Sequence, residues 1–235
     1  MLLAVDTSTP QIGLALYDGA QVLAEQLWTS KVRHTVELAP AVSDMLARAG
    51  LKTGQLKALG VAIGPGSFTS LRVGLSFIKG LALALALPVV GINTLDILAA
   101  SQPTGSYPLA CLLPAGRGRL AVGWYDPPAG IRSAKKNGWR ARGAASILTA
   151  EALSASIIEE CAVCGDLTAL ERQSLKKNGK VWLISPALGT RRPAILAELA
   201  YQRWQAGSVD DVASLAPLYL HLADPIPDPS AASLP

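Results

Sequence analysis

Apolar and polar residues change their spacing several times along the first hundred residues of the chain. The apolar run Leu2 to Val5 stops at Asp6, and the segment IGLALYDG at 12–19 then alternates as a half-buried strand does. That segment ends in an Asp-Gly pair, a strong hairpin signal, before QVLAEQLW at 21–28. The pattern predicts three consecutive antiparallel strands.

The spacing then changes to that of helices. Thr35 is a candidate N-cap, and apolar residues repeat at helical spacing from there to Gly50, with Pro40 expected to kink the helix or shift its start. The elements predicted next are a strand at 58–63, a glycine-rich loop, a helix at about 68–87, a strand at 89–92 and a helix after 94. Hairpin strands followed by alternating helices and strands are typical of an α/β layered domain.

The second half of the chain has a weaker pattern, and the stretch 102–145 is rich in Pro, Gly and Arg. The predicted elements are strands at 109–113 and 119–125, a helix near 149–158, a strand at 161–164, a helix near 167–174, a strand at 180–184 and a helix at about 193–206. We expect two lobes, 1–101 and a smaller one at 102–224. The Pro- and Ser-rich tail at 225–235 is expected to fray.

Composition narrows the class of protein. Half of the 235 residues are apolar and 16% are charged, which is typical of a globular protein and excludes a disordered one. No basic region precedes the first apolar run, so no signal peptide is expected. The most apolar window is interrupted by Arg72 and Lys79, which leaves 13 residues at 80–92, too few to span a bilayer. We expect a soluble, cytoplasmic protein without a membrane segment.

Three cysteines are present, and an odd number argues against a disulfide framework. Cys161 and Cys164 form a CxxC pair within an apolar stretch that resembles a strand, where positions three apart point to opposite faces. No second CxxC and no nearby histidine completes a metal set. We interpret the cysteines as small buried hydrophobes.

Basic residues concentrate between 117 and 142. This segment contains seven basic residues and a single acid, Asp126, which gives a local net charge of +6. A basic stripe interleaved with aromatic residues could face nucleic acid or be a solvated hairpin, and both interpretations stay open. The basic residues are Arg117, Arg119, Arg132, Lys135, Lys136, Arg140 and Arg142.

Two stretches resemble phosphate-binding loops. Asp6, Thr7 and Ser8 follow the first strand, where they could bind an anion or where Asp6 could simply cap the turn. The loop GPGSFTSLRVG at 64–74 lacks the lysine and the spacing of a Walker A motif.

Two functions remain open for the glycine loop: anion binding and helix packing. Gly64 and Gly66 permit a tight turn, and Ser67 can cap the following helix, whose N-terminus could bind an anion. Alternatively, the small residues Ser67, Ser70 and Gly74 form a strip on adjacent helical turns that would let another helix approach closely.

A metal site is not expected. His34 and Glu37 could bind a metal from one helical face, but His221 is the only other histidine in the chain. Two ligands do not make a zinc site.

Four segments carry a family resemblance: LLAVDTST, HTVELAP, the long block GPGSFTSLRVGLSFIKGLALALALPVVGINTLD, and PLYL at 217–220. Together they resemble the bacterial TsaB (YeaZ) family, the non-catalytic partner of TsaD in making threonylcarbamoyladenosine at position 37 of tRNAs. The match is dense over residues 1–100 and thin beyond. The resemblance implies an actin-like ATPase, RNase H-like α/β fold in two lobes.

The resemblance also implies partners. Members pair with TsaD, help to recruit the ATPase TsaE, and self-associate through the same surface, so a homodimer is expected for the chain alone. The implied interface residues lie on the helices after His34 and after the glycine loop: His34, Ser67, Phe68, Ser70, Leu71, Gly74 and Ile78. Within the basic segment, Arg132, Lys135 and Lys136 are candidate contacts to tRNA.

Departures from TsaD imply that this chain lacks its own catalytic equipment. Thr94 and Leu98 stand where TsaD carries its metal-binding histidines, and the C-terminal half lacks clustered glycines. Within the TsaB pattern, Ser70 replaces a usual glycine and Pro114 a usual acid. We therefore expect no cofactor here, with ATP and metal on the partner subunits.

An enzyme remains the alternative. A free-standing actin-like kinase would bind ATP near Asp6 and Gly66. A metallopeptidase-like hydrolase would need a metal held by His34, Glu37 and Asp6.

Overall fold

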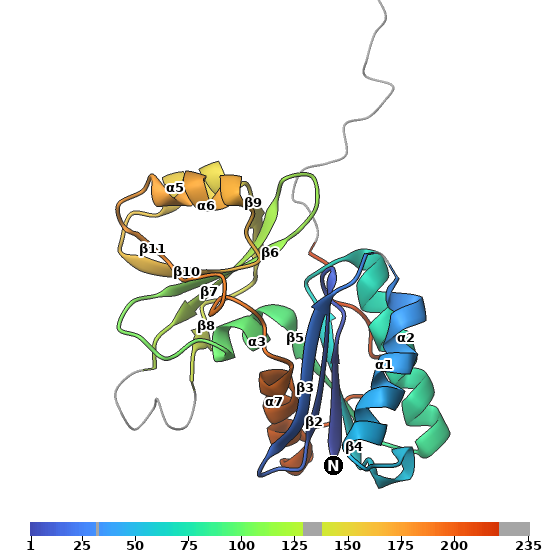
Figure 1. The fold of residues 1–235 in the computed structure, drawn as a ribbon. Coiled ribbons are helices and arrows are strands. Elements are labelled where there is room, and N and C mark those ends of the chain that lie inside the picture. Colours follow the sequence, from blue (N-terminus) through green and yellow to red (C-terminus); the bar gives the residue numbers. More distant parts are fainter. Residues whose placement is uncertain (32, 129–137, 221–235) are drawn as a thin grey trace, which may run out of the picture.

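The computed structural model describes residues 1–31, 33–128 and 138–220, whose elements form two sheets flanked by helices (Figure 1). The strands are β1 (Leu2–Asp6), β2 (Gln11–Tyr17), β3 (Val22–Thr29), β4 (Ala58–Gly64), β5 (Val89–Asn93), β6 (Leu109–Pro114), β7 (Leu120–Asp126), β8 (Arg140–Ala141), β9 (Ser146–Leu148), β10 (Cys161–Gly165) and β11 (Val181–Leu183). The helices are α1 (His34–Arg48), the 3-10 helix η1 (Thr53–Gln55), α2 (Phe68–Leu85), α3 (Thr94–Ala100), α5 (Ala150–Ser156), α6 (Ala169–Lys176) and α7 (Pro193–Gln205).

The first sheet has the strand order β3-β2-β1-β4-β5. Strands β1, β2 and β3 are antiparallel neighbours, as the alternating pattern predicts, whereas β4 and β5 run parallel to β1. Side chains of β1 alternate between two cores because successive residues of a strand point to opposite faces. Leu3 and Val5 pack beneath α1 and α2, whereas Leu2 and Ala4 pack beneath α7.

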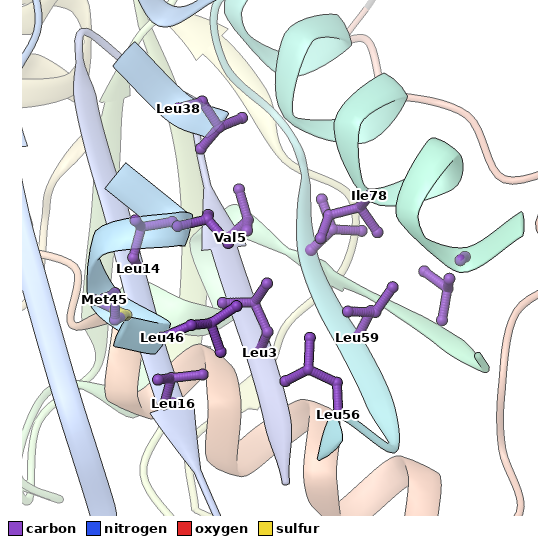
Figure 2. Packing of buried hydrophobic residues seen from close by; sticks show 14 of the residues in the cluster. Leu3, Val5, Leu14, Leu16, Leu38, Met45, Leu46, Leu56, Leu59 and Ile78 are labelled. Carbon is purple, nitrogen blue, oxygen red and sulfur yellow. The ribbon is translucent and has the colours of Figure 1, made fainter. Parts of the chain in front are cut away.

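The core between the first sheet and α1–α2 is formed by aliphatic side chains (Figure 2). Figure 2 shows Leu14 and Leu16 of β2 facing Met45 and Leu46 of α1, with Ile78 of α2 over the neighbouring strands. This packing explains why α1 continues through Pro40 to Arg48, although proline removes one helical hydrogen bond.

The start of α1 differs from the expected one. The helix begins at His34, with Arg33 as its N-cap and no side-chain cap bond, so Thr35 lies inside the helix and does not cap it. His34 is buried, and its Nε2 lies 3.0 Å from the Thr9 carbonyl oxygen. This tertiary contact holds the first turn, where the expected side-chain cap is missing.

The second sheet has the strand order β11-β10-β6-β7-β8, and β9 pairs with β7. Helices α5 and α6 cover one face and α3 covers the other. Cys161 belongs to the first of these cores and Cys164 to the second, which confirms that the two cysteines lie on opposite faces of β10. The short strands β8 and β9 were not predicted, because two or three residues give too few positions for a period to show.

The chain returns to the first sheet at its C-terminal end, unlike the expected division at residue 102. Helix α7 packs on β1, β4 and β5. The segment after it follows the edge of the sheet, where the Asp210 N–H donates to the Val89 carbonyl at 2.9 Å and the Leu218 N–H donates to the Ile63 carbonyl at 2.6 Å. Residues 193–220 therefore lie with residues 1–101, and the second lobe is shorter than expected.

Helix α2 is 18 residues long with a mean hydropathy of 1.4, so by length and composition alone it could cross a membrane. The uninterrupted apolar stretch of 13 residues in the sequence begins after Lys79, whereas the helix includes both Arg72 and Lys79. Leu75, Ile78 and Ala82 face the first sheet. This side of α2 packs in the core.

Candidate functional site

The candidate phosphate turn lies at the carboxyl end of β1 and is closed on itself. The Asp6 carboxylate accepts hydrogen bonds from the Ser8 N–H at 2.8 Å and from the Ser8 hydroxyl at 2.5 Å. Residues 6 to 9 are all buried. Asp6 caps its own turn, which was one of the two interpretations of the sequence.

A buried arginine fills the space beside this turn and joins the two lobes. Arg191 has 1% of its surface exposed and immediately precedes the N-cap of α7. Its Nε donates to Asp6 Oδ2 at 2.9 Å, its Nη1 to Asp166 Oδ2 at 2.6 Å and its Nη2 to Thr9 Oγ1 at 2.6 Å. Asp166 directly follows β10 of the second sheet. One guanidinium thus bridges the ends of β1 and β10.

The charge on Arg191 is permanent. Burial alone would lower the pKa of the guanidinium, but the carboxylates of Asp6 and Asp166 outweigh burial and raise the pKa above its ordinary value. The cluster is therefore one cation with two anions. Sequence reasoning missed Arg191 because 185 positions separate it from Asp6 and no local motif marks it.

The glycine loop packs directly on the same turn. The Ser67 N–H donates to the Ser8 carbonyl at 2.7 Å. A Cβ added to Gly66 would lie 2.1 Å from that same carbonyl oxygen, so only glycine permits this approach. The backbone donor that opens helix α2 is bound by the protein's own chain, where a phosphate cradle would present it to an anion.

The small residues of α2 are explained by the same contact. A Cβ added to Gly74 would lie 2.2 Å from Thr7 Oγ1, and that hydroxyl donates to the Ser70 carbonyl at 2.7 Å. Ser67 caps the helix as predicted, with its hydroxyl oxygen accepting from the Ser70 N–H. Within the chain, Gly74 admits the turn after β1, and the approach of a partner's helix to Ser67 and Ser70 stays a prediction.

The predicted interface residues separate into buried and accessible ones. His34, Leu71, Gly74 and Ile78 are buried, so a partner cannot contact them unless the fold rearranges. Ser67 and Ser70 are half-buried and Phe68 is 53% exposed.

A groove of about 430 Å³ lies beside these accessible residues, between α1 and α2. Sequence reasoning missed Arg72, Val73, Ser76 and Phe77, although their spacing of three and four residues marks a second helical stripe. The groove is lined by Thr35, Leu38, Ala39, Phe68, Thr69, Arg72, Val73, Ser76 and Phe77.

The structure does not bring the candidate metal ligands together. His34 contacts the Thr9 carbonyl, and the Glu37 carboxylate accepts from the Trp28 indole N–H at 2.8 Å. Among the residues described, no three His, Cys, Asp or Glu side chains gather in a way that could hold a metal ion. His221 lies outside the described residues.

Thr94 and Leu98, which stand in place of the TsaD histidines, have structural roles. The Thr94 hydroxyl oxygen accepts from the Gly64 N–H at 3.0 Å and so ties α3 to the glycine loop. Leu98 is fully buried in the core beneath α3.

Only part of the basic segment can be placed. Arg142 and Arg140 both pair with Asp126, at 2.7 and 3.6 Å, so the single acid of the segment serves two of its cations. Arg132, Lys135 and Lys136 lie outside the described residues, and their contact with tRNA stays a prediction.

The cysteines are free and buried. The Sγ atoms of Cys111 and Cys164 lie 3.6 Å apart on neighbouring strands. Burial raises the pKa of Cys161 to about 11 and that of Cys111 well above its ordinary value. These thiols are poor nucleophiles at neutral pH.

Known proteins match this chain over most of its length. A family model described as TsaD, tRNA N6-adenosine threonylcarbamoyltransferase, matches residues 21–222. The tRNA threonylcarbamoyladenosine biosynthesis protein TsaB of Bacillus subtilis is 29% identical over 95% of both chains, and that of Escherichia coli is 37% identical over 42% of each. The structure of YeaZ from Pseudomonas aeruginosa superposes with a TM-score of 0.72 at 23% identity, covering 92% of this chain and 99% of that one.

The two helix-flanked sheets and the structural match define the class: an actin-like, RNase H-like α/β fold in two lobes. Both sheets lie within the described residues, and Arg191 links them between Asp6 and Asp166. Within this class the chain belongs to the TsaB (YeaZ) family, and its process is tRNA threonylcarbamoyladenosine biosynthesis.

Proposed function

We propose that this chain is a non-catalytic subunit of the complex that adds a threonylcarbamoyl group to adenosine 37 of tRNA, and that it acts by binding TsaD. The observation that carries the proposal is the filled turn at the carboxyl end of β1. Arg191 and the glycine loop occupy the space on both sides of Asp6, where an actin-like enzyme would hold its nucleotide.

The positive charge of Arg191 does not make this turn a nucleotide-binding site. A guanidinium attracts phosphate, but that of Arg191 is buried and donates three of its five N–H groups to Asp6, Asp166 and Thr9. An incoming phosphate would also meet the carboxylates of Asp6 and Asp166. We propose that TsaD and the ATPase TsaE hold the ATP and the metal of the complex.

The surface for TsaD is proposed to be the α1–α2 groove. Its lining is apolar apart from Arg72 and a few hydroxyl groups, and Phe68 stands exposed at its rim. An exposed apolar groove between two helices fits a helix of another protein. Self-association of the free chain would use the same groove and would compete with TsaD.

Complex formation tests this surface. The purified chain is mixed with TsaD of the same organism, and the mass is measured by light scattering. Wild type is expected to form a one-to-one complex, which Ser76→Trp abolishes because Ser76 lines the groove. Ala84→Trp, at an exposed position of α2 outside the groove lining, is the matched control and should still bind.

Two results would overturn the docking proposal. One is the absence of a complex with wild type even when ATP and TsaE are present. The other is a Ser76→Trp variant that binds as wild type does.

Catalysis by the chain alone is tested separately. We expect no ATP hydrolysis by the purified chain and no thermal stabilisation by Mg-ATP, because a ligand stabilises only a protein that binds it. Measurable ATPase activity that Asp6→Asn abolishes would favour the free-standing kinase instead.

The contact with tRNA is proposed from the sequence. Changing Arg132, Lys135 and Lys136 together to Ala should lower the affinity of the complex for tRNA and flatten its salt dependence. Unchanged affinity would remove this contact. We propose that the protein acts on tRNA in the cytoplasm.

A further inference from the structure

We propose that Arg72 is a preformed docking point for a carboxylate of the protein partner, on the rim of the α1–α2 groove. The inference rests on the proposed function, because it adds the chemistry of recognition to the same surface. It concerns the one charged residue in the groove lining.

The side chain of Arg72 is held in place from two sides. Its guanidinium carbon lies 3.5 Å from the centre of the Phe68 ring, and its Nε donates to the Tyr219 hydroxyl at 3.0 Å. The Phe68 and Tyr219 rings are themselves neighbours, with centres 5.0 Å apart. A guanidinium stacked on an aromatic face has lost its flexibility before any partner arrives.

The C-terminal segment of the structure provides this support. Leu218 donates its N–H to the Ile63 carbonyl, and a Cβ added to Gly64 would lie 2.6 Å from the Leu218 carbonyl oxygen. Gly64 also has a φ of +109°, which disfavours any other residue. The glycine loop thus accommodates the PLYL segment, and that segment places Tyr219 against Arg72.

The guanidinium has donors left for a partner. Arginine carries five N–H groups, and Nε uses one of them on Tyr219. Within residues 1–31, 33–128 and 138–220, no carboxylate lies at ion-pair distance from Arg72. The two Nη groups match a carboxylate in a bidentate pair.

Charge selects the kind of occupant. The groove lining holds one positive charge and no negative one. A second copy seated symmetrically would bring another Arg72 and no carboxylate from its own groove. A different chain with an Asp or Glu beside apolar side chains satisfies both the groove and the guanidinium, so the inferred occupant is an acidic-apolar helix of TsaD.

The test measures the dissociation constant of the chain with TsaD for four variants. Arg72→Ala should raise Kd at least about 30-fold, as loss of an arginine anchor does. Arg72→Glu should raise it further through repulsion. Tyr219→Phe keeps the ring and removes the acceptor, so a rise of about 5-fold is expected. Arg48→Ala removes an equal charge from the other side of α1 and should change nothing.

Zero-length cross-linking identifies the partner carboxylate. Arg72→Lys places a primary amine at this position, and a carbodiimide joins it to a neighbouring carboxylate as an amide. Mass spectrometry should find position 72 linked to an Asp or Glu of TsaD. The wild-type complex should yield no such link at position 72, because a guanidinium does not react.

The outcomes separate this inference from the proposed function. A wild-type complex whose Kd is unchanged by Arg72→Ala and Arg72→Glu would overturn the docking point alone. Failure of wild type to bind TsaD would overturn the proposed function with it. Self-association that Arg72→Ala weakens, or a cross-link from position 72 to a second copy, would show that the occupant is another copy of this chain.

Discussion

Arg191 holds a buried charge balanced by two carboxylates, and its removal leaves both carboxylates without a cation. Replacing it by Met should therefore lower the free energy of unfolding by about 3–5 kcal/mol. Urea titration measures the change. The neighbouring Arg192 pairs with Glu25 at the surface, so Arg192→Met is the matched control and should lose no more than about 1 kcal/mol.

A second variant distinguishes the effect of uncompensated charge from the effect of lost packing. Arg191→Met combined with Asp6→Asn and Asp166→Asn removes the cation and both anions together. Its stability should recover a large part of the loss, because no uncompensated charge stays buried. A triple variant as unstable as Arg191→Met would show that packing, not charge, governs this site.

The burial of the cysteines predicts how fast their thiols react at a given pH. Burial disfavours the thiolate and raises the pKa of Cys161 to about 11, so at pH 8 its thiol stays protonated and unreactive. Ellman's reagent should label the native protein slowly at pH 8, whereas all three thiols should react quickly in denaturant. Fast labelling of the native protein would contradict the burial of these side chains.

Helix α2 contains two glycines with opposite roles. Gly74 faces Thr7, and a Cβ there would lie 2.2 Å from Oγ1, whereas a Cβ at Gly80 would meet no atom within 4 Å. Gly80→Ala should thus stabilise the protein by about 0.5–1 kcal/mol through helix propensity. Gly74→Ala should destabilise it by about 1–3 kcal/mol through overpacking, despite the same gain in propensity.

Combining Gly74→Ala with Thr7→Ala tests the cause of this difference. Removing Oγ1 and Cγ2 of Thr7 gives the new methyl group room, so the two changes together should cost less than their sum. Additive losses in thermal unfolding would place the strain elsewhere in α2.

The elements that the sequence predicted well are those whose burial repeats over several turns or alternations. The large side chains of β2 and the buried side chains of α2 each lie on one face against the same core, so their periods identify them, although β2 is buried on both faces and not half-buried as predicted. The start of α1 was wrong because a buried contact between His34 and Thr9 holds the first turn in place of a side-chain cap. Local capping signals cannot anticipate a contact made 25 positions away.

The candidate site was predicted only where its cause is local. The turn at Asp6 and the cap at Ser67 depend on neighbours within three residues, and the sequence indicates both. The filling of the site depends on Arg191 and Asp166, which are distant in sequence from Asp6 and carry no motif. The small residues of α2 were recognised as a packing strip, but periodicity does not identify the surface that packs there.

The two lobes are joined in a way that a single cut in the sequence cannot describe. The chain leaves the first sheet after α3, builds the second sheet, and returns as α7 and the segment at 209–220. Arg191 lies at this return, where it binds Asp6 and Thr9 of one lobe and Asp166 of the other. Residues of the chain itself therefore link the two lobes at this point.

Removing the Arg191–Asp166 ion pair should increase the mobility between the lobes and leave the α1–α2 groove unchanged. In Asp166→Ala, Arg191 keeps its pairing with Asp6 but loses its hold on the second lobe. Amide hydrogen exchange should rise at residues 6–9 and 189–193, and X-ray scattering should report a larger radius of gyration. Thr168→Ala, which removes the capping box of α6 two residues away, is the control and should affect α6 alone.

The same variant separates lobe geometry from recognition. The α1–α2 groove lies on the first lobe, away from Asp166, so Asp166→Ala should bind TsaD within about twofold of wild type, as independent sites do. If modification of tRNA falls while this affinity holds, the angle between the lobes matters to the complex after TsaD has bound. If affinity falls with it, the groove is coupled to the interlobe link through the turn at Asp6, which touches both Arg191 and the glycine loop.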